Sequence, residues 1–152
     1  MVVGGPNARS DFHVEAGDEW FYQLAGTLTL HTVAPDGAHS AVVLGPGDTY
    51  ALPGGVPHSP RRSAASVGLV VERRRRPGEV DALRWYCGRG GVPGGCGAVV
   101  HEEVFVCRDL AADLPPLVRG YWADVGKRTC GGCGWVEQPG GGGGGRGGGG
   151  GD

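Results

Sequence analysis

The sequence lacks the features of three large classes of protein. No run of about 18 apolar residues occurs among its 152 residues, so no membrane-spanning helix is expected. Its 14 basic residues are fewer than its 16 acidic residues, and the charge of −2 argues against a nucleic-acid-binding domain, which usually presents a basic face. Residues 1–5 have neither the charged nor the apolar region of a secretory signal, so we expect a cytoplasmic protein without nucleic-acid or membrane partners.

Glycine is abundant but concentrated at one end of the chain. Eleven of the 33 glycines lie between residues 140 and 151, a stretch with no apolar residue. We therefore expect residues 139–152 to form a disordered tail. The rest of the chain is long enough for one domain with a substantial core.

Short β-like segments separated by Gly and Pro turns fill the chain up to about residue 74. Thr27–Val33 alternates polar and apolar residues with a period of two, whereas Ser66–Glu72 is predicted to be a continuous apolar strand. Several such strands at close spacing predict a β-sandwich or β-barrel. We expect the barrel core to span residues 1–86, with residues 87–138 as the C-terminal part of the same domain.

The C-terminal part has the signals of one more strand and one helix. Val99–Cys107 is predicted to be a strand, and Asp109 is placed to cap a helix that runs to about Lys127. Pro115 and Pro116 would then lie near the start of that helix or break it.

Two spaced patterns in the first sixty residues indicate a metal site. They are His13-x5-Glu19-x6-Gly26 and Gly47-x5-Pro53-x-Gly55-x2-His58. Two imidazoles and one carboxylate form the facial triad typical of non-haem Fe(II) oxygenases, whose open positions let a substrate and O2 bind side by side. Together the patterns resemble the two motifs of the cupin superfamily of jelly-roll β-barrels, although Glu15 stands where most cupins have a second histidine.

The resemblance narrows to one family over residues 2–134. The matching strings include V-V-G-G-P-N-A-R-S-D-F-H (2–13), E-W-F-Y-Q (19–23), L-P-G-G-V-P-H-S-P (52–60) and G-L-V-V-E-R (68–73). They are similar to those of the 3-hydroxyanthranilate 3,4-dioxygenases, which are ring-cleaving cupins. The resemblance implies that Fe(II) is bound by His13, Glu19 and His58, and that O2 opens the ring of 3-hydroxyanthranilate to give 2-amino-3-carboxymuconate 6-semialdehyde. That product leads to quinolinate and NAD in the kynurenine pathway of tryptophan.

The resemblance also assigns roles around the substrate. Arg9 and Arg62 match family positions that bind its carboxylate, a task suited to the planar and always charged guanidinium. Glu72 matches the residue on the amine and hydroxyl side and is our candidate proton acceptor. Glu19 is expected to contact the substrate as well as the metal, and Asp11 to orient a ligand or the substrate. The family resemblance also favours a homodimer.

The five cysteines, in a chain without an export signal, read better as metal ligands or free thiols than as disulfides. Cys130 and Cys133 have the spacing by which two thiolates hold one tetrahedral metal. The resemblance assigns the second pair to Cys87 and Cys96, which flank a glycine-rich insert whose closure cost grows only slowly with length. The choice between zinc and iron stays open at this second site. Cys107 is left as a buried free thiol.

The sequence is compatible with three functions. The leading one is the ring-cleaving dioxygenase. Because the family normally has a segment before the V-V-G-G-P string, an N-terminally truncated, catalytically impaired metal-binding cupin is the alternative. A cupin with another small-molecule reaction is the third, and the joint presence of Arg9, Arg62 and Glu72 argues against it. The basic run Arg73–Arg76 is interpreted as a solvated strand end rather than a phosphate site.

Overall fold

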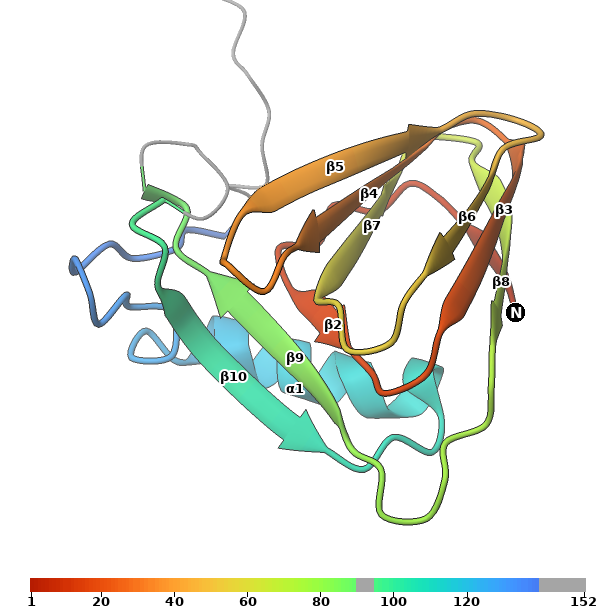
Figure 1. Cartoon of the computed structure of the whole chain (residues 1–152). Helices are drawn as coiled ribbons and strands as arrows, with labels where there is room; N and C mark the ends of the chain where they lie inside the picture. The colour runs from red at the N-terminus through yellow and green to blue at the C-terminus, as the bar shows by residue number, and fades with distance from the viewer. Residues whose placement is uncertain (90–94, 140–152) are drawn as a thin grey trace, which may run out of the picture.

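A computed structural model describes residues 1–89 and 95–139 (Figure 1). The expected disordered tail, except Pro139, and most of the glycine-rich insert therefore lie outside the described residues. The elements are β1 (Val2–Gly4), β2 (Phe12–Val14), β3 (Glu19–Ala25), β4 (Leu28–Val33), β5 (His39–Leu44), β6 (Thr49–Leu52), β7 (His58–Arg62), β8 (Val67–Glu72), β9 (Asp81–Tyr86), β10 (Val99–Phe105) and α1 (Leu110–Ala123). None of the described helices combines the length and apolarity needed to cross a bilayer.

The strands form two antiparallel sheets that face each other (Figure 1). One has the order β1-β8-β3-β6, and the other has the order β10-β9-β2-β7-β4-β5. Alternate side chains of both sheets point into the space between them, as the period-two pattern predicts. The buried residues of this main core are Phe21, Leu28, Leu30, Leu44, Leu52 and Val70. The mainly β jelly-roll architecture expected from the sequence is confirmed.

The motif glycine Gly26 makes the turn between β3 and β4 possible. Its φ of 64° lies in the left-handed region, and a Cβ at this position would come within 2.8 Å of Ser66 Cα. Only glycine avoids both the backbone strain and the clash. The turn carries the chain from one sheet to the other and so places Glu19 opposite the histidine-bearing strands.

The helix begins where the sequence predicts it but ends earlier. The Asp109 side chain caps it by accepting a hydrogen bond from Ala111 N at 2.9 Å, which confirms the predicted cap. The helix ends at Ala123 rather than near Lys127, and Pro115 and Pro116 lie inside it without breaking it. Both prolines are exposed, and so are Ala111 and Ala112, whose carbonyls lose their helical donors and can bind water instead.

A second cluster joins the helix to the larger sheet. Leu83 and Trp85 of β9 pack against Tyr121 of α1, and the Trp85 and Tyr121 rings stack with centroids 4.2 Å apart. The Tyr121 hydroxyl donates a hydrogen bond to the buried Glu137 carboxylate. This contact ties the end of the described chain to the helix.

We expect the substitution Tyr121→Phe to lower the free energy of unfolding by about 1–3 kcal/mol, because it leaves the buried Glu137 carboxylate without its donor. Urea denaturation measures this difference. Tyr22→Phe is the matched control, since the Tyr22 hydroxyl has no hydrogen bond to any described residue, and it should change stability little. Equal effects of the two substitutions would contradict a stabilising role for the Tyr121–Glu137 contact.

Candidate metal centre

Three strands bring His13, Glu19 and His58 together. β2 and β7 are neighbours in the larger sheet, and His13 pairs directly with His58 across them. Glu19 begins β3 in the opposite sheet. One ligand atom from each residue lies within 4.8 Å of the other two, and all three side chains are buried. The predicted triad is therefore a real cluster, formed by side chains that share the interior face.

The hydrogen bonds within this cluster suit a bound cation. His58 donates from Nδ1 to the Val56 carbonyl at 3.0 Å, so Nε2 carries the lone pair, and it lies 2.8 Å from Glu19 Oε1. That oxygen is buried without a hydrogen bond to any described residue. A lone pair and a carboxylate oxygen facing each other in a buried site are the donors that a divalent metal takes. The residues present thus fit a metal ion.

Three further acidic residues surround the triad. Ligand atoms of Glu15, Glu19 and Glu72 lie within 4.8 Å of one another, and Asp81 forms a similar group with His13 and Glu15. We call Glu15, Glu19, Glu72 and Asp81, together with His13 and His58, the acidic pocket. Burial, and then the charges of Glu19 and Glu72, raise the pKa of Glu15 to about 8. The surplus of buried negative charge favours either a proton or a metal cation.

The basic residue that contacts the acidic pocket is Arg75, for which the sequence predicts a solvated strand end. That interpretation is wrong for Arg75, whose side chain is only 18% exposed. It contacts Glu15 Oε2 at 2.5 Å and both oxygens of Asp81 at 2.7–3.0 Å. Asp81 Oδ2 is also 2.7 Å from His13 Nε2. Burial opposes ionisation of Asp81, but the hydrogen bonds from His13 and Arg75 lower its pKa to about 2.

Sequence patterns assign no role in the site to Arg75 or Asp81, and Glu15 stands out only as a departure from the cupin motif. β2 pairs with β9 so that His13 lies opposite Leu83, and Asp81, two residues from Leu83, faces the same side of the sheet as His13. This pairing is not visible in the chain order. Asp11, which is expected to orient a ligand or the substrate, accepts hydrogen bonds from Arg9.

Arg62 is buried on the same strand as His58. Its Nη1 donates to Gln23 Oε1 at 3.1 Å, while its Nε is buried without a partner. No described carboxylate forms an ion pair with it. Burial lowers the pKa of this guanidinium, as expected for a charge without a counter-ion. A buried guanidinium with an unfilled fork is suited to bind an anionic group from outside the chain.

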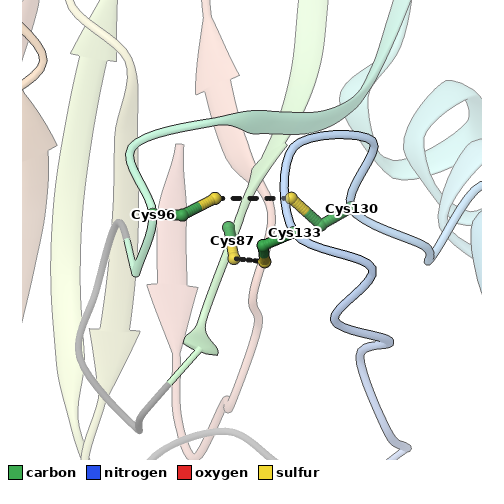
Figure 2. Close-up of side chains that lie close together, drawn as sticks. All are labelled: Cys87, Cys96, Cys130 and Cys133. Carbon is green, nitrogen blue, oxygen red and sulfur yellow. Dashed lines mark hydrogen bonds between the residues drawn. The ribbon is translucent and has the colours of Figure 1, made fainter.

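The cysteine cluster lies where β9, β10 and the segment after α1 meet (Figure 2). The Sγ atoms of Cys87 and Cys133 are 3.7 Å apart, and those of Cys96 and Cys130 are 3.5 Å apart. These separations exceed a disulfide bond of about 2.05 Å. They are close to the ~3.8 Å between sulfurs that tetrahedral metal–thiolate bonds of about 2.3 Å produce. The structure therefore brings together the four cysteines that the resemblance grouped.

Comparison with known proteins decides the family. The family model for 3-hydroxyanthranilic acid dioxygenase matches residues 1–122. The chain belongs to the 3-hydroxyanthranilic acid dioxygenase family. It is 42% identical over 144 residues to the 3-hydroxyanthranilate 3,4-dioxygenase of Pyricularia oryzae, covering 92% of this chain and 77% of that protein. The protein of the same name from Xanthomonas euvesicatoria is 42% identical over 134 residues, covering 88% of this chain and 72% of its own.

Members of the 3-hydroxyanthranilic acid dioxygenase family are metal-dependent dioxygenases. The metal-compatible cluster of His13, Glu19 and His58 lies in the part of the chain that the family model matches. Among solved structures, an oxalate decarboxylase of Bacillus subtilis aligns with 81% of this chain and 27% of its own, with a TM-score of 0.44 and 18% identity. Family membership rests on the sequence comparisons.

We expect Arg62→Met to raise the free energy of unfolding by about 1 kcal/mol or more, because it removes a buried charge that no described carboxylate compensates. Thermal or urea denaturation of the metal-free protein measures the change. Arg119→Met is the control, because Arg119 is exposed on α1 and its removal relieves no buried charge. A clear loss of stability in R62M would show that Arg62 holds the fold together.

Proposed function

We propose that the protein is an Fe(II)-dependent ring-cleaving dioxygenase that converts 3-hydroxyanthranilate and O2 into 2-amino-3-carboxymuconate 6-semialdehyde. The observation that carries the proposal is the buried His13–Glu19–His58 group, with its ligand atoms within 4.8 Å, in a chain of this family. The named relatives support the substrate. In this proposal the product serves quinolinate and NAD biosynthesis from tryptophan, and the enzyme is a homodimer.

Iron would be held by His13, Glu19 and His58. Two imidazoles and one carboxylate leave positions open, at which Fe(II) would bind the substrate's hydroxyl and amino groups beside O2. The hydrogen bond from His58 Nδ1 to Val56 O fixes the tautomer that leaves Nε2 free. The chain therefore prepares His58 as a ligand before any metal binds.

The substrate carboxylate would be bound by arginine. Arg62 is the stronger candidate of the two, because its guanidinium is buried and its Nε is unpaired. A substrate carboxylate would supply the missing counter-ion and would accept two parallel hydrogen bonds. Arg9 is already held by Asp11, so its fork is oriented by a carboxylate of the chain rather than left free. Asp11 would act in this way as a positioning residue for Arg9.

Glu72 would accept the proton of the substrate's hydroxyl group. Glu72 lies close to the proposed iron ligands, because it pairs with Glu19 across β3 and β8. Its carboxylate lies within 4.8 Å of the Glu19 carboxylate. Arg75 Nη2 lies 3.6 Å from Glu72 Oε2, so a positive charge faces this carboxylate. An ionised carboxylate is the form that can remove a proton.

The four cysteines would hold a second metal ion, iron or zinc, in a structural role. The sulfur separations of 3.5 and 3.7 Å support this site. A thiolate is the form that binds metal. The cluster joins Cys87 and Cys96 to the distant segment after α1, as a structural metal site commonly does.

Anaerobic loading with Fe(II), followed by 3-hydroxyanthranilate and O2, tests the proposed reaction. We expect ring-opened product at turnover rates, measured by its new near-ultraviolet absorbance and by oxygen uptake in equal amount. Iron binding without product would instead favour the alternative, a metal-binding cupin without catalysis.

Two variants separate substrate binding from metal binding in this assay. Arg62→Met should raise KM at least ~10-fold, the loss expected for a hydrogen-bonded charge of about 1.5–3 kcal/mol, and should leave the iron content unchanged. Arg61→Met, on the other face of β7, should retain the parent KM. An unchanged KM in R62M would rule out the proposed position of the substrate carboxylate.

Cys130→Ser is expected to remove the second metal, because it deletes one of four ligands and the hydroxyl is a poor substitute for a thiolate. Elemental analysis of the purified protein should show one metal equivalent fewer, with the iron at the histidine site retained. Cys107→Ser is the control, since Cys107 is buried and lies outside the cluster. Identical metal contents in the two variants would refute the four-cysteine site.

A further inference from the structure

The acidic pocket offers a metal more carboxylates than a facial triad uses. Besides His13, Glu19 and His58, two other groups have ligand atoms within 4.8 Å of one another. These groups are His13 with Glu15 and Asp81, and Glu15 with Glu19 and Glu72. A small rearrangement of Glu15 or Asp81 would therefore be enough to add a ligand. Each added carboxylate would fill a position that substrate and O2 need.

One side chain holds the two extra carboxylates. Arg75 Nη2 is shared between Glu15 Oε2 at 2.5 Å and Asp81 Oδ2 at 2.7 Å, while its Nε lies 2.8 Å from Asp81 Oδ1. Glu15 and Asp81 are almost wholly buried, so water cannot replace Arg75 as their partner. Glu15 Oε1 has no hydrogen bond to any described residue, and Arg75 is therefore the main restraint on that side chain.

The chain around Arg75 is built to keep it in this position. Arg75 lies in the segment between β8 and β9, and the neighbouring Arg73 forms two hydrogen bonds of 2.7 Å to Glu79 across the same segment. The Arg76 backbone N–H donates to Glu79 as well, at 2.7 Å. These outer contacts close the turn that returns the chain to Asp81, so that Arg75 and Asp81 meet inside it.

We propose that Arg75 is a positioning residue that keeps Glu15 and Asp81 from becoming metal ligands, so that the metal bound by His13, Glu19 and His58 retains open positions. The proposal rests on the proposed metal centre, but it does not depend on the identity of the substrate. It also explains why a planar guanidinium occupies this position, since Lys has a single ammonium and cannot bind two carboxylates in a fixed fork.

Nitric oxide binding to the Fe(II)-loaded protein tests the proposal, because nitric oxide needs an open position and its iron complex has a distinct electron paramagnetic resonance signal. The variants are Arg75→Gln and Arg75→Lys. Arg74→Gln is the matched control from the same basic run, because the Arg74 side chain is exposed and forms no hydrogen bond to a described residue. We expect R75Q to bind iron at least as tightly as the parent but to lose most of the nitrosyl signal. R75K should lose part of it, and R74Q should keep it.

The double variant E15Q/R75Q makes the test specific for released carboxylates. An amide is a poorer metal ligand than a carboxylate, so this variant should regain nitrosyl signal relative to R75Q. The ring-cleaving activity of R75Q should fall about 10- to 100-fold, the loss typical of residues that position metal ligands. No gain in E15Q/R75Q over R75Q would contradict the proposal.

Two other results would overturn it. The first is a parent-level nitrosyl signal in folded R75Q, or in R75K if R75Q does not fold. The second is a folded R75Q that has lost its iron affinity, because Arg75 would then support His13 rather than restrain Glu15 and Asp81. A parent protein that binds iron and nitric oxide but opens no ring would count against the proposed substrate alone, and the comparison of the Arg75 variants would still stand.

Discussion

The constraint on which the centre of this molecule depends is charge balance. Four carboxylates, from Glu15, Glu19, Glu72 and Asp81, share the acidic pocket with one guanidinium, from Arg75. In a buried site such an excess of like charge is costly, and a proton or a cation relieves it. The same residues that make the metal-free pocket unfavourable therefore create its affinity for a divalent ion. The surrounding strands hold the carboxylates together against their mutual repulsion.

Arg62 is a second buried charge that the chain does not compensate, and it is positive rather than negative. Its guanidinium is buried beside Gln23 and has no anionic partner among the described residues. A fold selected only for stability would place an apolar side chain at such a position. Unfavourable charge burial at two points of one interior, negative around His13 and positive at Arg62, is typical of a site that binds complementary groups. A metal cation and an organic anion are such groups.

The sequence predicts the parts of the site that are set by local spacing. His13 and Glu19 are close in the chain, and Gly26 allows the turn that follows. His58 lies in the second motif and reaches His13 through the pairing of β2 with β7. The cap at Asp109 was predicted for the same reason, because it depends on a few neighbouring residues. Local patterns also predicted the mainly β fold, since the alternation in each strand shows which face is buried.

The remaining parts depend on contacts that the chain order hides. Asp81 reaches His13 only because β9 pairs with β2, and Arg75 reaches Glu15 across sixty residues. A run of four arginines gives no signal that one of them points inward while its neighbours remain near the surface. The helix end at Ala123 is a local feature instead, since Asp124 is extended and its side chain accepts a hydrogen bond from Gly126 N at 2.8 Å.

The cysteine cluster affects how well the chain tolerates the insertion of residues between Cys87 and Cys96. Cys87 and Cys96 mark the two ends of the glycine-rich insert, and both sulfurs are held near those of Cys133 and Cys130. With its ends anchored, the insert can lengthen at a cost that rises only with the logarithm of its length. The strands on either side would keep their register. This position is therefore where a peptide tag or a small foreign domain could be spliced into the protein with the least disturbance to its chemistry.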